Sequence, residues 1–445
     1  MTKQKYRSTQ THVKHEILSK YLDTWGGIIL SGLQKSETKY QRRFVYVDCC
    51  ASSGKYQGDK EDEYKHDSKI GPVYGSPIIG LNALDKLMEH SNKRDITNVY
   101  VNSILVEQNQ KCYQELKNTL IECGYESRIK ETIDFASLQN GEIALVNADV
   151  TQIGDELIRF TNIKGTWAFY LLDPYGPKAI PFPFVKKIIE CEHHDVMINL
   201  IYEDLVRKTG MAPNTNLSQK HKQLVEYWIE AYSKVVWDQH VVPCISKMED
   251  LHEFNIESYM ELGAFSISDS EDSEMKIDIT REEVLSDAYK IALQTMDPKI
   301  VVKLIALKFP DKERTMLYLF LTTHDPTGAL ELNKILSNAK LLEYQLKSRL
   351  STLKKIPQGQ MSLWNLVDDI SKVEQSERPT TQSIANEIYE MFAGNSSTRR
   401  QIYASLIDTD YFPSEINKAL NLLCSQGKAN YDGKLTHNSK IKFLR

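Results

Sequence analysis

Five short apolar runs in the first half of the chain constrain its fold more than any other feature. They span Phe44 to Val47, Ser103 to Val106, Ile143 to Val146, Trp167 to Leu172 and Val196 to Ile201, and each has a polar residue beside it. Continuous apolar runs of this length are typical of parallel strands that are buried on both faces of a sheet. The gaps between the runs are long enough for helices, so the pattern predicts a doubly wound α/β fold.

Two further apolar runs predict how this sheet closes. Ile300 to Phe309 and Met316 to Thr322 are separated only by residues 310–314. No crossover helix fits into so short a gap, so these two strands must be antiparallel. Five parallel strands followed by a closing antiparallel hairpin match the Rossmann-like sheet of class I S-adenosylmethionine-dependent methyltransferases. An ordinary dinucleotide-binding fold would lack the hairpin.

The length of 445 residues allows two to four domains at roughly 150 residues each. We assign residues 1–204 and 286–350 to the methyltransferase-like domain. Residues 205–285 look helical at first and then acidic, and we expect them to form an inserted lid or cap. Residues 351–380 have the composition of a linker, and residues 381–445 form a separate unit.

This last unit combines helical stretches with a β-hairpin. The helices are expected near residues 382–393, 397–407 and 414–426. Asp432 and Gly433 form a strong turn signal between two short strands. The order predicts a winged-helix domain, whose third helix would be the recognition helix if it contacts DNA. That helix carries only Lys418 as a base-reading cation, so a protein-docking role stays open.

Composition excludes several classes of protein. The chain is 41% hydrophobic and 26% charged, which is the balance of a soluble globular protein. No apolar run approaches the roughly 20 residues of a membrane-spanning helix, and we find no signal peptide. Seven cysteines at irregular spacing, without a C-x-x-C pair, argue against a disulfide framework and a zinc site. We therefore expect a cytoplasmic protein without membrane or metal.

The net charge of −5 hides an uneven distribution of charge along the chain. Residues 1–43 carry a net charge of +6 and residues 427–445 carry +4, whereas residues 268–283 carry −5. Basic ends are compatible both with contact to a polyanion such as DNA or RNA and with ordinary solvated surfaces.

Acidic residues at the ends of three predicted strands indicate a cofactor site. The run VYVDCCASSG places Asp48 at the end of the first strand and the small residues Ala51 and Gly54 after it, where a ligand can approach the backbone. Glu107 ends the second strand and suits hydrogen bonding to ribose hydroxyls. Asp149 follows the third strand, where it can reach an adenine edge. The pattern predicts binding of S-adenosylmethionine, although each residue also has an ordinary surface interpretation.

The sharpest motif is Asp173-Pro174-Tyr175-Gly176, which follows the buried run WAFYLL. Here Asp173 can accept hydrogen bonds from a planar amine, Pro174 fixes the turn, and Tyr175 can stack on the ring. Catalysis in such a site is mainly positioning of the amine. We therefore predict that these three residues are catalytic, and a tight structural turn is the alternative.

Several motifs occur in a matching order from about residue 12 to the end of the chain. They are the run from Lys14 to Leu18 with Tyr21, Leu22 and Trp25, then YVDCCASSGKYQG, Gly75-Ser76-Pro77, LLDPYG, MLYLFLTTHDPTG and the winged-helix-like tail. In the identity and order of these motifs, the chain resembles the three-Cys-motif partner (TcmP) family. The resemblance implies a methyltransferase-like protein of prokaryotic origin, a nucleic-acid-related role, a mobile or defence-type context and a partner protein with a three-cysteine motif.

The chain departs from the family pattern D-x-F-A-G-x-G after the first strand. Asp48, Ala51 and Gly54 match it, whereas Cys50 replaces the aromatic residue and Ser52 replaces a glycine. A Cβ atom at position 52 either crowds the cofactor or requires a different backbone angle.

Three functions are compatible with these observations. The first is a methyltransferase that acts on a nucleobase amine of DNA or RNA, within a prokaryotic multi-protein system. The second is a catalytically degenerate nucleic-acid-binding or assembly subunit that keeps the fold. The third is a nucleotide-sensing component of a defence system. We favour the first because Glu107 and Asp173 match the expected sites.

Overall fold

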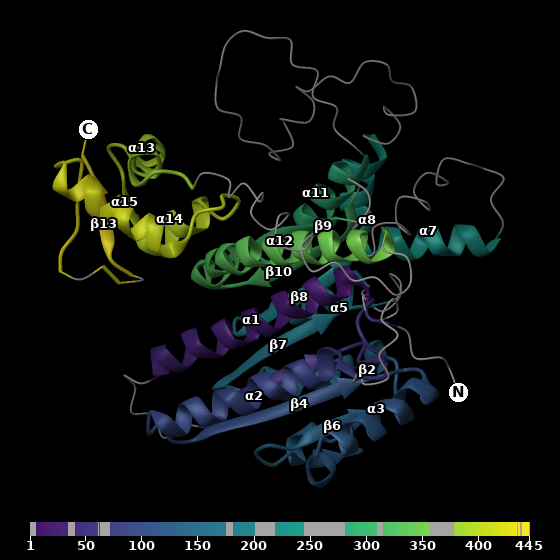
Figure 1. Ribbon diagram of the computed structural model, residues 1–445. Helices are drawn as coiled ribbons and strands as arrows, with labels where there is room; N and C mark the ends of the chain where they lie inside the picture. Colours follow the sequence, from purple (N-terminus) through teal and green to yellow (C-terminus); the bar gives the residue numbers. More distant parts are fainter. Residues whose placement is uncertain are drawn as a thin grey trace.

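The computed structural model describes residues 6–33, 41–60, 62, 72–174, 181–200, 219–243, 281–308, 315–355, 378–433, 435–436 and 438–444. Strands of the central sheet are β1 (Arg42–Asp48), β4 (Val99–Val106), β5 (Ile129–Lys130), β6 (Ile143–Val146), β7 (Thr166–Leu172), β8 (His194–Leu200), β9 (Val301–Lys308) and β10 (Thr315–Thr323). They form an eight-stranded sheet in the described part of the chain, in the order β5-β6-β4-β1-β7-β8-β10-β9 (Figure 1).

Most of this sheet is parallel. β5, β6, β4, β1, β7 and β8 pair in parallel with their neighbours, whereas β10 is antiparallel to both β8 and β9. The predicted mixed α/β fold with a large, mostly parallel sheet is therefore confirmed. The two-residue strand β5 was not predicted, because so short a strand has no apolar run of its own.

Helices cover both faces of the sheet. The longer ones are α1 (Thr9–Leu33), α2 (Ser76–Lys93), α3 (Gln110–Glu122), α4 (Gly154–Thr161), α5 (Phe182–Ile189), α7 (Gln219–Tyr232), α11 (Arg281–Gln294) and α12 (Pro326–Lys355). Side chains alternate along a strand, so Phe44 and Tyr46 face one core and Val45 and Val47 face the other. The first core includes α1, α2, α3 and α12, and the second includes α4, α5, α7 and α11.

Short elements connect these helices and strands. They are β2 (Lys55–Tyr56), β3 (Val73–Tyr74), the 3-10 turns Glu126–Arg128, Phe135–Ser137 and Val150–Gln152, α8 (Lys234–Val236) and the π-helical turn Trp237–Val241. No helix in the part of the chain that the structure describes is long and apolar enough to cross a membrane.

The predicted insertion, residues 205–285, is described only at residues 219–243 and from residue 281 onward. In these parts Trp228 and Trp237 are buried and join the core on one face of the sheet. The rest of the predicted lid lies outside the described residues, and the domain boundaries stay predictions.

The C-terminal unit has an apolar core of its own. Its elements are α13 (Thr381–Phe392), β11 (Ser396–Thr398), α14 (Arg399–Ser405), α15 (Pro413–Ser425), β12 (Ala429–Asn430) and β13 (Lys440–Phe443). The three predicted helices are present, and the strands form a sheet in the order β11-β13-β12. β11 was missed because it is a polar tripeptide that becomes a strand only by pairing with β13. Asp432 and Gly433 lie in a loop between β12 and β13 that is longer than a two-residue turn.

Two buried polar side chains hold this unit against the central sheet. Lys303 on β9 donates to the carbonyl oxygens of Ile407 at 2.8 Å and Thr409 at 2.9 Å. Asn333 on α12 donates to the carbonyl oxygens of Thr409 at 2.9 Å and Tyr411 at 2.8 Å. The unit is therefore docked on the body of the molecule through specific contacts. Most of the predicted linker lies outside the described residues, and its first residues extend α12.

Candidate functional site

The carboxyl ends of the central parallel strands bring most of the predicted site residues to one edge of the sheet. Asp48 is the last residue of β1, Glu107 follows β4, and Asp173 follows β7. β1 lies between β4 and β7, so the three carboxylates come from adjacent strands. Crevices beyond the carboxyl ends of such strands are where open α/β sheets bind ligands.

Glu107 organises the loops at this edge. Its two carboxylate oxygens accept hydrogen bonds from the backbone amides of Ser52 and Asn109, both at 2.7 Å. Its backbone carbonyl accepts a hydrogen bond from the Asn147 side chain, also at 2.7 Å. The side chain thus joins the loops that follow β1 and β4, and each carboxylate oxygen keeps a lone pair for a further donor.

The loop after β1 contains two residues with left-handed backbone conformations. Ser52 has a φ of 55° and Gly54 a φ of 73°. A Cβ atom on Gly54 would lie 2.7 Å from Leu116 Cδ1, so a larger residue would have to displace that side chain and also adopt a strained φ. Ser52 thus adopts a left-handed conformation that glycine would adopt more readily.

Asp48 is completely buried below this loop. Its carboxylate accepts hydrogen bonds from the Tyr46 hydroxyl and the Cys50 amide, each at 3.2 Å. Burial raises the pKa of Asp48 to about 6, and hydrogen bonds from Ser76 and Cys50 limit the rise. The amide of the buried Ala51 donates to the carbonyl oxygen of Val106 at 2.9 Å, so Ala51 helps to fix the loop on β4.

Asp149 lies beside the loop after β4. One of its oxygens accepts hydrogen bonds from the amide of Thr151 at 3.0 Å and from its hydroxyl at 2.7 Å. The other accepts from the Gln108 side chain at 3.4 Å. Asp149 therefore begins the short helical turn that follows it and stands next to the Glu107 loop.

Asp173 is held by two side chains from separate elements. Lys14 on α1 forms an ion pair with one carboxylate oxygen, and the Asn199 amide donates to the other. Leu172 pairs with Ile198 in the parallel register, which places Asn199 alongside Asp173. Pro174 is buried after it, and Tyr175 lies outside the described residues. Sequence reasoning missed Asn199, since nothing local distinguishes this residue inside an apolar run.

Further buried polar groups line the start of α1. Lys14, His15 and Gln10 are each at least nine-tenths buried. Burial and the nearby Lys14 charge lower the pKa of His15 well below its usual range, so its imidazole is neutral. In the described part of the chain, His15 Nδ1 and Gln10 Nε2 have no hydrogen-bond partner. Such groups leave unused hydrogen-bonding capacity on α1.

Neither the adjacent thiols of Cys49 and Cys50 nor a group of metal-ligating side chains forms a further site among the described residues. Burial raises the pKa of both Cys49 and Cys50 well above the usual range, which makes them poor nucleophiles. Among the described residues, no group of three or more His, Cys, Asp and Glu side chains could hold a metal ion.

No family model matches the chain, and no curated protein matches its sequence. Among solved structures, it is distantly similar to protein LPL1258 from Legionella pneumophila, a protein of the DUF519 family. The match has 10% sequence identity, covers 77% of this chain and 93% of the Legionella chain, and has a TM-score of 0.36. The resemblance to the TcmP family stays a prediction.

Proposed function

We propose that the protein is an S-adenosylmethionine-dependent methyltransferase that acts on an exocyclic amine of a nucleobase in DNA or RNA. The observation that carries this proposal is the meeting of Asp48, Glu107 and Asp173 at the carboxyl ends of three adjacent strands. The closing antiparallel pair β9 and β10 supports it, because class I methyltransferases have a sheet of this kind.

S-adenosylmethionine would supply an electrophilic methyl group at this edge. The free lone pairs of Glu107 suit donation from ribose hydroxyls, although the carboxylate already accepts two backbone amides. Asp149 stands beside the Glu107 loop, where it would meet the adenine edge. Asp48 and Ala51 would support the loop, and Gly54 keeps it packed on α3.

Asp173 would hold the acceptor amine. Its ion pair with Lys14 and its hydrogen bond from Asn199 orient the carboxylate, so that a lone pair can accept a hydrogen bond from the amine. Pro174 would keep the turn rigid, and Tyr175 would stack on the base. Positioning of the nitrogen lone pair is the chemistry that such an arrangement provides.

We also propose that the C-terminal unit is a winged-helix domain that contacts nucleic acid. Its order of helices and strands, with β13 between β11 and β12, supports this. Ser414, Lys418 and Asn421 are exposed and recur along one face of α15 at helical spacing. A duplex substrate would have to present its target base out of the stack.

A second candidate is the non-catalytic subunit that binds nucleic acid or assembles a complex. It is favoured by one observation, namely that the Ser52 amide and the Lys14 ammonium already occupy Glu107 and Asp173. The TcmP resemblance supports a cytoplasmic prokaryotic context and a three-Cys-motif partner for either candidate.

Calorimetric titration of the full chain with S-adenosylmethionine and S-adenosylhomocysteine tests the first candidate. We expect micromolar binding that falls at least tenfold in Glu107→Gln, a loss of about 1.4 kcal/mol. Glu126→Gln, an exposed carboxylate remote from the loop, serves as the matched control and should bind as the parent does.

Transfer of a labelled methyl group to DNA and RNA then tests catalysis. We expect transfer by the parent and its loss in Asp173→Ala. Absence of binding to both ligands would reject the methyltransferase proposal for this chain and favour the non-catalytic subunit. Unchanged transfer in Asp173→Ala would reject the role of Asp173.

A further inference from the structure

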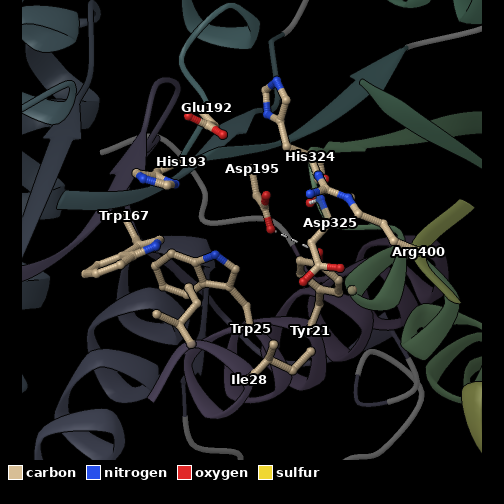
Figure 2. Close-up of a pocket in the computed structure, with 13 residues that line it drawn as sticks. Tyr21, Trp25, Ile28, Trp167, Glu192, His193, Asp195, His324, Asp325 and Arg400 are labelled. Atoms are coloured by element: carbon tan, nitrogen blue, oxygen red, sulfur yellow. Dashed lines mark hydrogen bonds between the residues drawn. The ribbon is translucent and has the colours of Figure 1, made fainter. Parts of the chain in front are cut away.

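A cavity lies at the opposite edge of the sheet from the candidate site. It occupies about 240 Å³ beside the amino ends of β7 and β8, where Trp167 and Asp195 lie (Figure 2). Tyr21 and Trp25 on α1 line another side. Arg400 on α14 completes it, so the cavity joins the central sheet to the C-terminal unit. Its volume is just under the roughly 300–1,000 Å³ of drug-sized sites, which suits a ligand of a few heavy atoms.

Charge in this cavity is unbalanced. Glu192, Asp195 and Asp325 contribute carboxylates and Arg400 one guanidinium, which is a formal net charge of −2 when the two histidines are not counted. That guanidinium donates to the carbonyl oxygen of His324 at 2.6 Å. The cavity therefore attracts cations over anions.

Asp195 has no cationic partner among the described residues. Its carboxylate accepts a hydrogen bond from the Tyr21 hydroxyl at 3.2 Å, which Figure 2 shows as a dashed line. Burial raises the pKa of Asp195 to about 7, and the nearby Asp325 adds to the rise. A ligand cation would relieve this unfavourable burial of negative charge.

Aromatic rings form the walls of the cavity. Trp167 stacks on Phe44 with ring centroids 5.5 Å apart, and Trp25 meets Phe44 edge to face at 5.8 Å. Both indoles are therefore fixed by packing, and indole faces attract organic cations.

The Trp25 indole nitrogen points to the same space. The side chain is 6% exposed and lines the cavity. In Figure 2 the nitrogen lies on the edge of the ring directed toward the Asp195 side of the cavity. An indole N–H that faces a cavity suits a ligand that carries an oxygen acceptor.

We propose that this cavity binds a small amino alcohol, with the ammonium group against Asp195 and Asp325 and the hydroxyl oxygen at Trp25. The indole walls would enclose its carbon atoms. The site is separate from the proposed methyltransferase site, and it bridges two units of the fold.

Titration of the full chain with choline and with ethanolamine, followed by calorimetry and tryptophan fluorescence, tests the proposal. The uncharged isostere of choline, 3,3-dimethylbutan-1-ol, is the matched probe. We expect saturable binding of at least one ammonium probe, and at least tenfold weaker binding of the isostere. Equal binding of choline and its isostere would overturn the proposal, as would the absence of saturable binding of both ammonium probes. Binding of adenosine without binding of the amines would overturn it as well.

Variants locate the site. Asp195→Asn and Asp325→Asn each keep a hydrogen-bond acceptor and remove a charge, and each should weaken binding at least tenfold. Glu89→Gln on α2, an exposed carboxylate, should bind like the parent. Trp25→Phe should lower choline affinity toward that of tetramethylammonium, which lacks the hydroxyl. If one Asp variant fails to fold in a thermal melt, the other provides the test, and unchanged binding in it would overturn the assignment.

Discussion

The carboxylate of Glu107 accepts a hydrogen bond at 2.7 Å from the backbone amide of Ser52, a residue 55 positions earlier in the chain. The bond joins the loops at the ends of two adjacent strands. Ser52 adopts a left-handed conformation, with a φ of 55°. Ser52, where the chain departs from the pattern of the TcmP family that we predict it resembles, thus contacts the carboxylate that we propose for ribose binding.

We expect Ser52→Gly to stabilise the protein by about 0.5 kcal/mol. Glycine adopts a positive φ without the steric cost that a Cβ atom adds, and this gain exceeds its larger loss of backbone entropy. Urea unfolding measures the change. Ser53→Gly is the control, because Ser53 has no positive φ, and it should destabilise the protein. Equal effects of the two substitutions would contradict the role of backbone strain.

The ion pair between Lys14 and Asp173 should contribute measurably to the free energy of unfolding, as a coupling energy between the two side chains. Both side chains are largely shielded from solvent, so removal of one partner leaves a poorly solvated charge. We expect a double-mutant cycle with Lys14→Met and Asp173→Asn to give a coupling energy of about 2 kcal/mol in urea unfolding. The exposed pair of Lys86 and Asp23 is the matched control and should give less than about 1 kcal/mol. A coupling energy near that of the control would argue against a specific pairing.

Stability should fall as the pH rises from about 4 through 6, in part because of Asp48. Its folded pKa of about 6 lies above the usual 3.8, so the folded state keeps a proton that the unfolded state has lost. The resulting stability is present at low pH and is lost as the pH passes the folded value. The Asp48→Asn variant cannot ionise at this position. Relative to it, the parent should lose about 2 kcal/mol over this interval. Parallel pH profiles for the two proteins would contradict the raised pKa.

Lys303→Met should weaken the docking of the C-terminal unit on the rest of the molecule. The substitution keeps the apolar stem, removes the Lys303 donor of the Ile407 carbonyl oxygen and leaves the Thr409 carbonyl oxygen with Asn333. We expect a loss of about 2 kcal/mol in unfolding free energy. Hydrogen exchange should also become faster in α13, α14 and α15. Lys334→Met on the exposed face of α12 is the control and should change neither quantity. Unchanged exchange in Lys303→Met would show that other contacts hold the unit.

Local patterns in the sequence determined the sheet. A strand that is buried on both faces shows directly as a continuous apolar run, so the five parallel strands and the antiparallel pair were found near their observed positions. The length of the connection between the last two strands also restricted the topology, because residues 310–314 are too few for the crossover that a parallel pair needs. Asp48, Glu107 and Asp173 followed from the same rule, since parallel strands place their carboxyl ends at one edge.

Tertiary structure alone decided how the side chains at that edge are paired. Lys14 and Asp173 are 159 positions apart, and Asn199 reaches Asp173 only through strand register. The backbone angle of Ser52 and the cavity beside Asp195 likewise depend on contacts between elements remote in sequence. Periodicity reports which face of an element is buried, but it carries no information about which distant group lies opposite. Which distant group lies opposite a given residue is decided by how the helices pack on the sheet.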